Sequence, residues 1–162
     1  MLTERMPILP PRSLVIVDRD YDLTLATMSN VVIAHWRGPS DERNGKRLET
    51  TLRELARTNP IGFVSLVEPS SAPPDKAQRL HLTRIVGELP IQALTTVVRG
   101  SALRRSFATV VLTSMLFLVS AELSSRTSVC SNEHDAAAWI YTHLAFAPPL
   151  AELTRALEYL QA

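Results

Sequence analysis

The chain has 162 residues, of which 46% are hydrophobic and 20% charged, and its formal net charge at pH 7 is +1. This length fits one domain that buries roughly two thirds of its unfolded surface, and the near-neutral charge excludes a bulk attraction to nucleic acid or to an anionic membrane. The single cysteine, Cys130, excludes an intramolecular disulfide. Since the N-terminus also lacks the apolar core of a secretory signal, we expect a cytoplasmic protein.

The N-terminal part of the chain predicts a tail followed by a β-meander. Residues 1–11 contain three prolines and no periodicity, which is typical of a flexible tail. Short strands are then expected over 13–17, 21–28 and 31–36, joined by turns at 18–20 and 29–30. The middle strand alternates apolar and polar residues, so we expect it to be half-exposed.

Two helices and a buried strand are expected in the next part of the chain. Ser40 is a possible cap for a helix that Asn59 and Pro60 terminate, and Gly45 weakens its first turns. The apolar run 61–67 predicts a strand covered on both faces. After a proline-rich loop, Pro73 and Pro74 suit the first positions of a second helix, which ends before the proline at 90.

The stretch 91–123 is the most apolar part of the chain. It predicts a buried strand, a turn at Arg99 and Gly100, and a long helix over 101–121 that is apolar on most of its circumference. Its charge-free part, 106–121, is shorter than the roughly 20 residues that span a bilayer. We therefore expect a central packing helix, and a membrane location is not expected.

The C-terminal part predicts a strand over 127–130, a helix capped by Asn132, and a terminal amphipathic helix over 148–162. A leucine stripe runs along that last helix at positions Leu150, Leu153, Leu157 and Leu160. The stripe predicts either core packing or an oligomer interface. The expected fold class is α/β: a mixed sheet with an opening antiparallel meander, then parallel strands with helices packed on the faces, forming one domain over 12–147.

Several segments together resemble the STAS-like domains, the class of the sporulation anti-sigma-factor antagonist of bacteria, and the related CRAL-TRIO lipid-transfer domains. The resemblance rests on four units: the paired strands ending at Trp36, the unit IGFVSLVEPSSAPPDKAQR, the unit VVRGSALRRSFATVV, and the closing strand and helix ending HDAAAWIYTHL. It implies a STAS-like fold and a non-catalytic regulatory module that binds a partner protein and is often switched by serine phosphorylation. In phosphorylated members an Asp-Ser pair begins a helix, whereas the corresponding loop here reads Glu-Pro-Ser-Ser and offers Ser70 and Ser71.

The turn before the long helix is a candidate anion-binding or partner-binding site. If Ser101 caps that helix, Arg104 and Arg105 lie in its first turn, where the helix dipole disfavours cations. Backbone N–H groups after Gly100, the Ser101 hydroxyl and the two guanidinium groups could together hold a phosphate or a partner's carboxylate. The alternative is that both arginines extend into solvent or pair with acidic neighbours.

No reaction or cofactor signature accompanies these features. The sequence contains no nucleophile elbow, Walker-type loop, dinucleotide fingerprint or zinc-protease motif. The four histidines show no ligand spacing with Cys130 or with carboxylates, so no metal and no cofactor are expected.

The leading functional hypothesis, which the resemblance implies, is a STAS-like regulatory module that binds a protein partner, with a homodimer as one expected assembly and no nucleic acid involved. The alternative hypothesis is a small-molecule or lipid-binding domain with its pocket between the sheet and the 101–121 helix.

Overall fold

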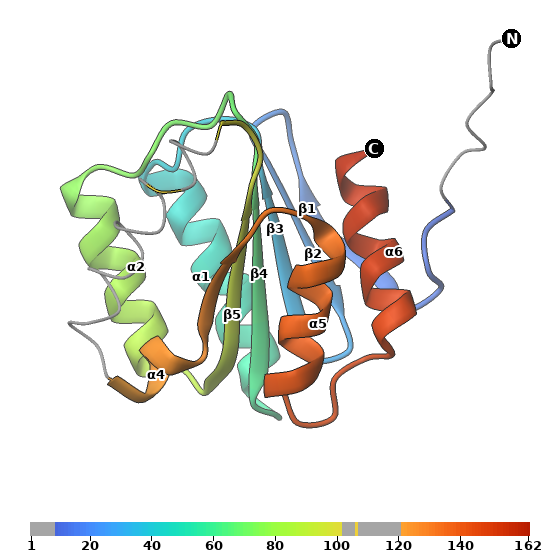
Figure 1. Ribbon diagram of the computed structural model, residues 1–162. Helices are drawn as coiled ribbons and strands as arrows, with labels where there is room; N and C mark the ends of the chain where they lie inside the picture. Colours follow the sequence, from blue (N-terminus) through green and yellow to red (C-terminus); the bar gives the residue numbers. More distant parts are fainter. Residues whose placement is uncertain (1–8, 102–105, 107–120) are drawn as a thin grey trace, which may run out of the picture.

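The computed structural model describes residues 9–101, 106 and 121–162. Within these residues the chain forms six strands and five helices (Figure 1): β1 Leu14–Arg19, β2 Leu23–Met28, β3 Val31–Trp36, α1 Glu42–Ala56, β4 Ile61–Val67, α2 Lys76–Glu88, β5 Ile91–Val98, α4 Ala121–Ser125, β6 Thr127–Cys130, α5 Glu133–His143 and α6 Leu150–Gln161. Most of the expected central helix over 101–121, including Arg104 and Arg105, lies outside the described residues, as does most of the expected N-terminal tail.

The strands form one mixed sheet in the order β1-β2-β3-β4-β5-β6. The first three strands are antiparallel neighbours, and β3, β4, β5 and β6 are parallel to one another. The crossover from β3 to β4 contains α1, and the crossover from β4 to β5 contains α2, as parallel strands require a long connection. The α/β class and the change from an antiparallel meander to parallel strands were both predicted correctly.

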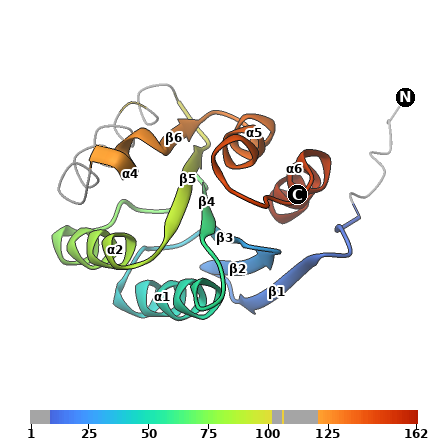
Figure 2. The same ribbon diagram turned by 90° about the horizontal axis from the view of Figure 1, so that it is seen from below.

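Helices cover both faces of the sheet (Figure 2). On one face α1 and α2 pack over a core that includes Trp36, Leu48 and Phe63. On the other face α5 and α6 pack over a second core that includes Ile33 and Leu66. Since successive residues of a strand point to opposite faces, β2, β3, β4 and β5 each supply side chains to both cores.

The first hairpin differs from its expected form in two respects. The strand β1 continues through Asp18 and Arg19, because both residues pair with β2 after a bulge at Val17. The turn therefore falls at Asp20–Asp22 and not at 18–20. The strand β2 is almost wholly buried and not half-exposed, because one of its faces lies in each core.

Both early helices begin at an aspartate rather than at the expected positions. The Asp41 side chain accepts a hydrogen bond from the Asn44 N–H at 2.9 Å, so Asp41 caps α1 in place of Ser40. Asp75 caps α2 through the Gln78 N–H at 2.9 Å, so Pro73 and Pro74 lie in the preceding loop and not in the helix. An aspartate side chain accepts from the second or third helical N–H, which neither serine nor proline does here.

Gly45, inside α1, lies against side chains of α2. A Cβ atom on Gly45 would lie 2.7 Å from the Gln78 Oε1 atom of α2. Gly45 itself is buried and the helix is regular around it. A Cβ at this position would therefore displace the end of the Gln78 side chain.

The terminal leucine stripe packs inside the molecule. Leu153 and Leu157 are fully buried in the second core, and Leu150 and Leu160 are partly buried against it. Of the two fates expected for the stripe, core packing is the one observed, because α6 lies against α5 and the sheet.

Among the helices of the described residues, none combines the length and the apolar character needed to cross a bilayer.

Candidate functional site

The carboxyl ends of the parallel strands lie at the upper end of the sheet in Figure 1. Charged and polar side chains contact one another there. We call this group the edge network and define it as Arg37, His35, Glu68, Arg99 and Glu133. Its members come from β3, from the residues just after β3, β4 and β5, and from the first turn of α5. Because adjacent parallel strands end in register, Trp36 opposite Val67 and Val67 opposite Val98, these side chains come together at one edge.

His35 lies at the centre of the edge network and has a fixed tautomer. Its Nδ1 atom is 3.0 Å from Nη1 of Arg37, and its Nε2 atom is 2.9 Å from Oε1 of Glu68. A guanidinium group only donates, so Nδ1 must accept, and Nε2 then carries the proton that is donated to Glu68. The buried imidazole therefore links a cation on one side to a carboxylate on the other.

Arg37 also fastens the neighbouring hairpin to β3. Its guanidinium group donates to the carbonyl oxygens of Asp20 and Tyr21 at 2.6 and 3.1 Å, and to the Thr24 hydroxyl at 2.8 Å. When Nδ1 of His35 is included, the guanidinium group of Arg37 contacts four acceptors. The β1–β2 turn is thus held against the end of β3 by one side chain.

The other half of the edge network connects the sheet to both C-terminal helices. Arg99 donates to Oε1 of Glu133 at 2.6 Å and to Oε1 of Gln161 at 2.7 Å. Its Nε atom also lies 3.9 Å from Oε1 of Glu68. Since Glu133 begins α5 and Gln161 ends α6, Arg99 joins both helices to the end of β5.

Burial lowers the pKa of His35 below its usual value of 6.5. The hydrogen bond to Glu68 acts in the opposite direction, and the Arg37 charge lowers the pKa further. Loss of solvation is the largest effect because the charged imidazolium would lose water on a side chain that is only 6% exposed. His35 is accordingly neutral in the folded chain at pH 7.

A pH dependence of stability follows from this shift. The unfolded chain takes up a proton at His35 near pH 6.5, whereas the folded chain does so only at lower pH. The contribution of neutral His35 to the free energy of unfolding is therefore complete above pH 6.5, and it decreases as the pH falls through the pKa of the folded chain. We expect urea unfolding to show a lower free energy at pH 5.5 than at pH 7.5, and the His35→Gln variant to show a smaller difference. An equal difference in both proteins would contradict the assignment.

The two candidate phosphorylation sites differ in accessibility. Ser71 is buried at 5% exposure, and its hydroxyl donates to the Gly38 carbonyl at 2.8 Å. Ser70 is exposed, and its hydroxyl donates to the Arg37 carbonyl at 2.6 Å. Neither serine caps α2. Both instead tie the β4–α2 loop to the end of β3, and only Ser70 presents its side chain to solvent.

The candidate anion site is described only in part. Gly100 has a φ of 120°, a left-handed conformation that favours glycine, and Ser101 is exposed beside it. Both residues directly follow Arg99, so the start of the expected site adjoins the edge network. Arg104 and Arg105 lie outside the described residues.

Sequence reasoning did not single out the edge network or the exposed Tyr21. The Tyr21 side chain is 89% exposed in the β1–β2 turn, one residue from Asp20, whose carbonyl Arg37 binds. A usable signal existed in the residues that directly follow the parallel strands, Arg37, Glu68 and Arg99. All three are charged, and ligands of open α/β sheets bind at this edge.

Both ring nitrogens of His35 are engaged by side chains of the edge network. The hydrogen-bond partners of His35 are a cation and a carboxylate, and within the described residues no cluster of three His, Cys, Asp or Glu side chains could hold a metal ion. Cys130 is half-buried on β6, where its Sγ atom lies 3.3 Å from the Thr95 hydroxyl.

Comparison with known proteins adds no assignment to this geometry. No protein-family model and no curated protein matches the sequence.

Proposed function

We propose that this chain is a non-catalytic regulatory module of the STAS-like kind that binds a partner protein at the carboxyl edge of its sheet. The binding surface consists of Tyr21, the edge network, and the loops that carry Ser70 and Gly100. We further propose that the module acts in the cytoplasm.

The observation that carries this proposal is the exposed aromatic ring of Tyr21 beside a preformed set of charged groups. Tyrosine and arginine are enriched at the centres of protein interfaces, and Tyr21 is 89% exposed while the Arg99 side chain is 42% exposed. The charged groups are already held by mutual contacts, so little side-chain order has to be gained on binding.

The resemblance to STAS-like domains supports the same class of function. It covers the strand-loop-helix unit that carries Ser70, which is the accessible one of the two serines. A phosphate there would add negative charge to the loop beside Arg37 and so change the charge presented to a partner. The small-molecule alternative would need a pocket beside the 101–121 helix, which lies mostly outside the described residues.

Site-specific photo-crosslinking in the native host tests this proposal. A photoreactive phenylalanine analogue replaces Tyr21 at the carboxyl edge and, in a matched control, Tyr141 on α5, which is also exposed, at 54%. We expect a discrete protein adduct from position 21 and none from position 141. Excess unlabelled wild-type chain should suppress the adduct, whereas excess Arg99→Ala chain should not.

The mass of the adduct separates two kinds of partner. An adduct of twice the mass of the chain identifies a second copy and supports a homodimer through this edge, and any other discrete mass identifies a different protein. Adducts from position 141 alone, or suppression by wild-type and Arg99→Ala chains alike, would overturn the proposal.

A further inference from the structure

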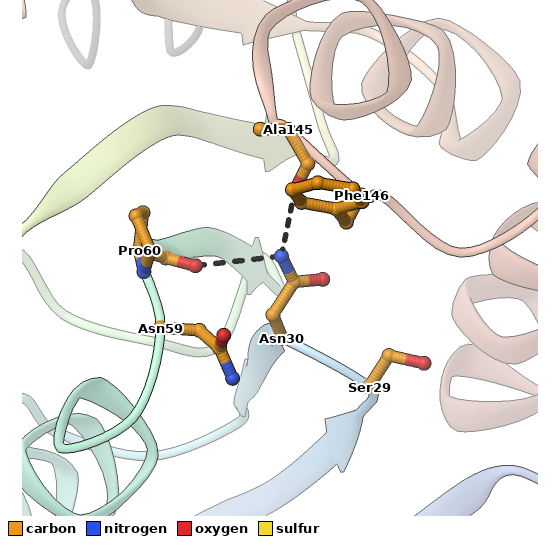
Figure 3. A pocket seen from close by; sticks show the side chains of 6 residues that line it. All are labelled: Ser29, Asn30, Asn59, Pro60, Ala145 and Phe146. Carbon is orange, nitrogen blue, oxygen red and sulfur yellow. Dashed lines mark hydrogen bonds between the residues drawn. The ribbon is translucent and has the colours of Figure 1, made fainter.

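A second surface lies at the opposite edge of the sheet, away from the edge network. A pocket of about 320 Å³ opens there between three loops (Figure 3), and it is lined by Ser29, Asn30, Asn59, Pro60, Ala145 and Phe146. The lining residues come from the β2–β3 turn, the segment before β4 and the segment after α5. This volume is at the lower end of the range for small-molecule pockets, roughly 300–1,000 Å³.

Phe146 contradicts the usual preferences at its position in two ways. Its side chain is 97% exposed, and its backbone has a φ of 56°, in the left-handed region that glycine or asparagine normally occupies after a helix. An exposed phenylalanine in this conformation gains almost nothing from packing within the described residues. Residues held in such conformations concentrate at binding sites, where the side chain has a use that folding alone does not explain.

The Asn30 side chain supplies an acceptor without a partner. Both of its amide hydrogens are directed at carbonyl groups, the Ala145 oxygen at 2.9 Å and the Pro60 oxygen at 3.4 Å. Its Oδ1 atom is buried and has no hydrogen-bond partner among the described residues, and it points away from those two carbonyls (Figure 3). A buried acceptor of this kind favours a ligand that brings a hydrogen-bond donor.

The electrostatic environment of the pocket favours a hydrogen-bond donor that is positively charged. None of the six lining residues is charged, and the pocket adjoins the C-terminal end of α5, where the helix dipole favours positive charge. The exposed face of the Phe146 ring also attracts cations. Three independent features, an acceptor, a helix C-terminus and an aromatic face, therefore converge on one ligand class.

We propose that this pocket binds an organic cation that carries a guanidinium or primary ammonium group. The cationic group donates to Oδ1 of Asn30 and lies against the exposed face of the Phe146 ring. The same group can be carried by a free small molecule or by an arginine side chain of a peptide. This inference concerns the amino edge of the parallel strands and does not depend on the function proposed for the carboxyl edge.

Nuclear magnetic resonance of the full chain tests the site with agmatine, which carries both cationic groups. We expect saturable shifts of the Asn30 side-chain amide and of the Ala145 and Phe146 backbone amides. Neutral butylurea, a planar donor of similar length, should cause no such shifts. Saturable binding of butylurea with the affinity of agmatine, or no saturable shift with agmatine at millimolar concentration, would overturn the proposal.

Two variants at Phe146 separate binding from folding. Phe146→Gly suits the left-handed backbone, so its unfolding midpoint should be unchanged or raised, while agmatine affinity should fall about tenfold. Phe146→Tyr keeps an aromatic face and should retain the affinity. Equal affinity in wild type and Phe146→Gly would show that the ring takes no part and would contradict the site.

A second titration, with a peptide, identifies whether the cation comes from a small molecule or from an arginine side chain. The tripeptide Gly-Arg-Gly is titrated under the same conditions as agmatine. Matching shifts with both probes support recognition of an arginine side chain, and shifts with agmatine alone support a free small cation.

Discussion

Replacing Leu153 by alanine should lower the free energy of unfolding by about 2–5 kcal/mol. Leu153 is fully buried on α6, within the core that α5 and α6 form with the sheet. The truncation removes buried apolar surface and leaves a cavity that the surrounding strands and helices fill only in part. Urea unfolding followed by circular dichroism measures the change.

Leu80→Ala is the matched control for this substitution. Leu80 is also a helical leucine, on α2, but it is 57% exposed. Its truncation should change stability by no more than about 1 kcal/mol. If Leu153→Ala were as mild as Leu80→Ala, α6 would not be a structural part of the core.

Replacing Arg37 by alanine should destabilise the chain by about 2–4 kcal/mol, although Arg37 lies at the edge of the sheet. The substitution leaves four acceptors without their donor: the Asp20 and Tyr21 carbonyls, the Thr24 hydroxyl and Nδ1 of His35. Partly buried acceptors that lose a charged donor cost more than an average surface contact. Urea unfolding of wild type and variant gives the difference.

The Arg37→Ala variant has a second readout at His35. Removal of the guanidinium charge and of its hydrogen bond to Nδ1 should raise the pKa of His35 relative to wild type, because both interactions favour the neutral ring. Titration of the imidazole by nuclear magnetic resonance measures this change. An unchanged pKa would mean that Arg37 does not determine the protonation of His35.

Arg155→Ala on α6 is the control for the loss of one positive charge without the loss of the contacts that Arg37 makes. Arg155 is exposed, and its truncation should change neither the stability by more than about 0.5 kcal/mol nor the His35 titration. A comparable loss in both variants would assign the effect to net charge rather than to the contacts of Arg37.

The two surfaces place different chemistry at the two ends of the same strands. The carboxyl edge presents paired charges and Tyr21, and the amino edge presents uncharged amides and Phe146. Between them lie the two apolar cores, which hold the edges in fixed relative positions. Variants at one edge are therefore expected to leave binding at the other unchanged.

Local sequence patterns were sufficient to predict the α/β class and the types of most of the described elements. The apolar run over 61–67 and the turn residues around it identified β4, and the asparagine at 132 identified the start of α5, because these signals act within a few residues of the chain. The change from a meander to parallel strands also followed from local spacing, since parallel neighbours require a crossover.

The tertiary structure alone decided what distant residues do together. His35 is hydrogen-bonded to Glu68, which is 33 residues away, and Arg99 meets Gln161 across 62 residues. Likewise, only the packing of α6 against α5 and the sheet placed the leucine stripe in the core. The sequence by itself determined the types of most of the described elements and the Asn132 cap, which are local, whereas burial and ion pairing depend on which strands end side by side.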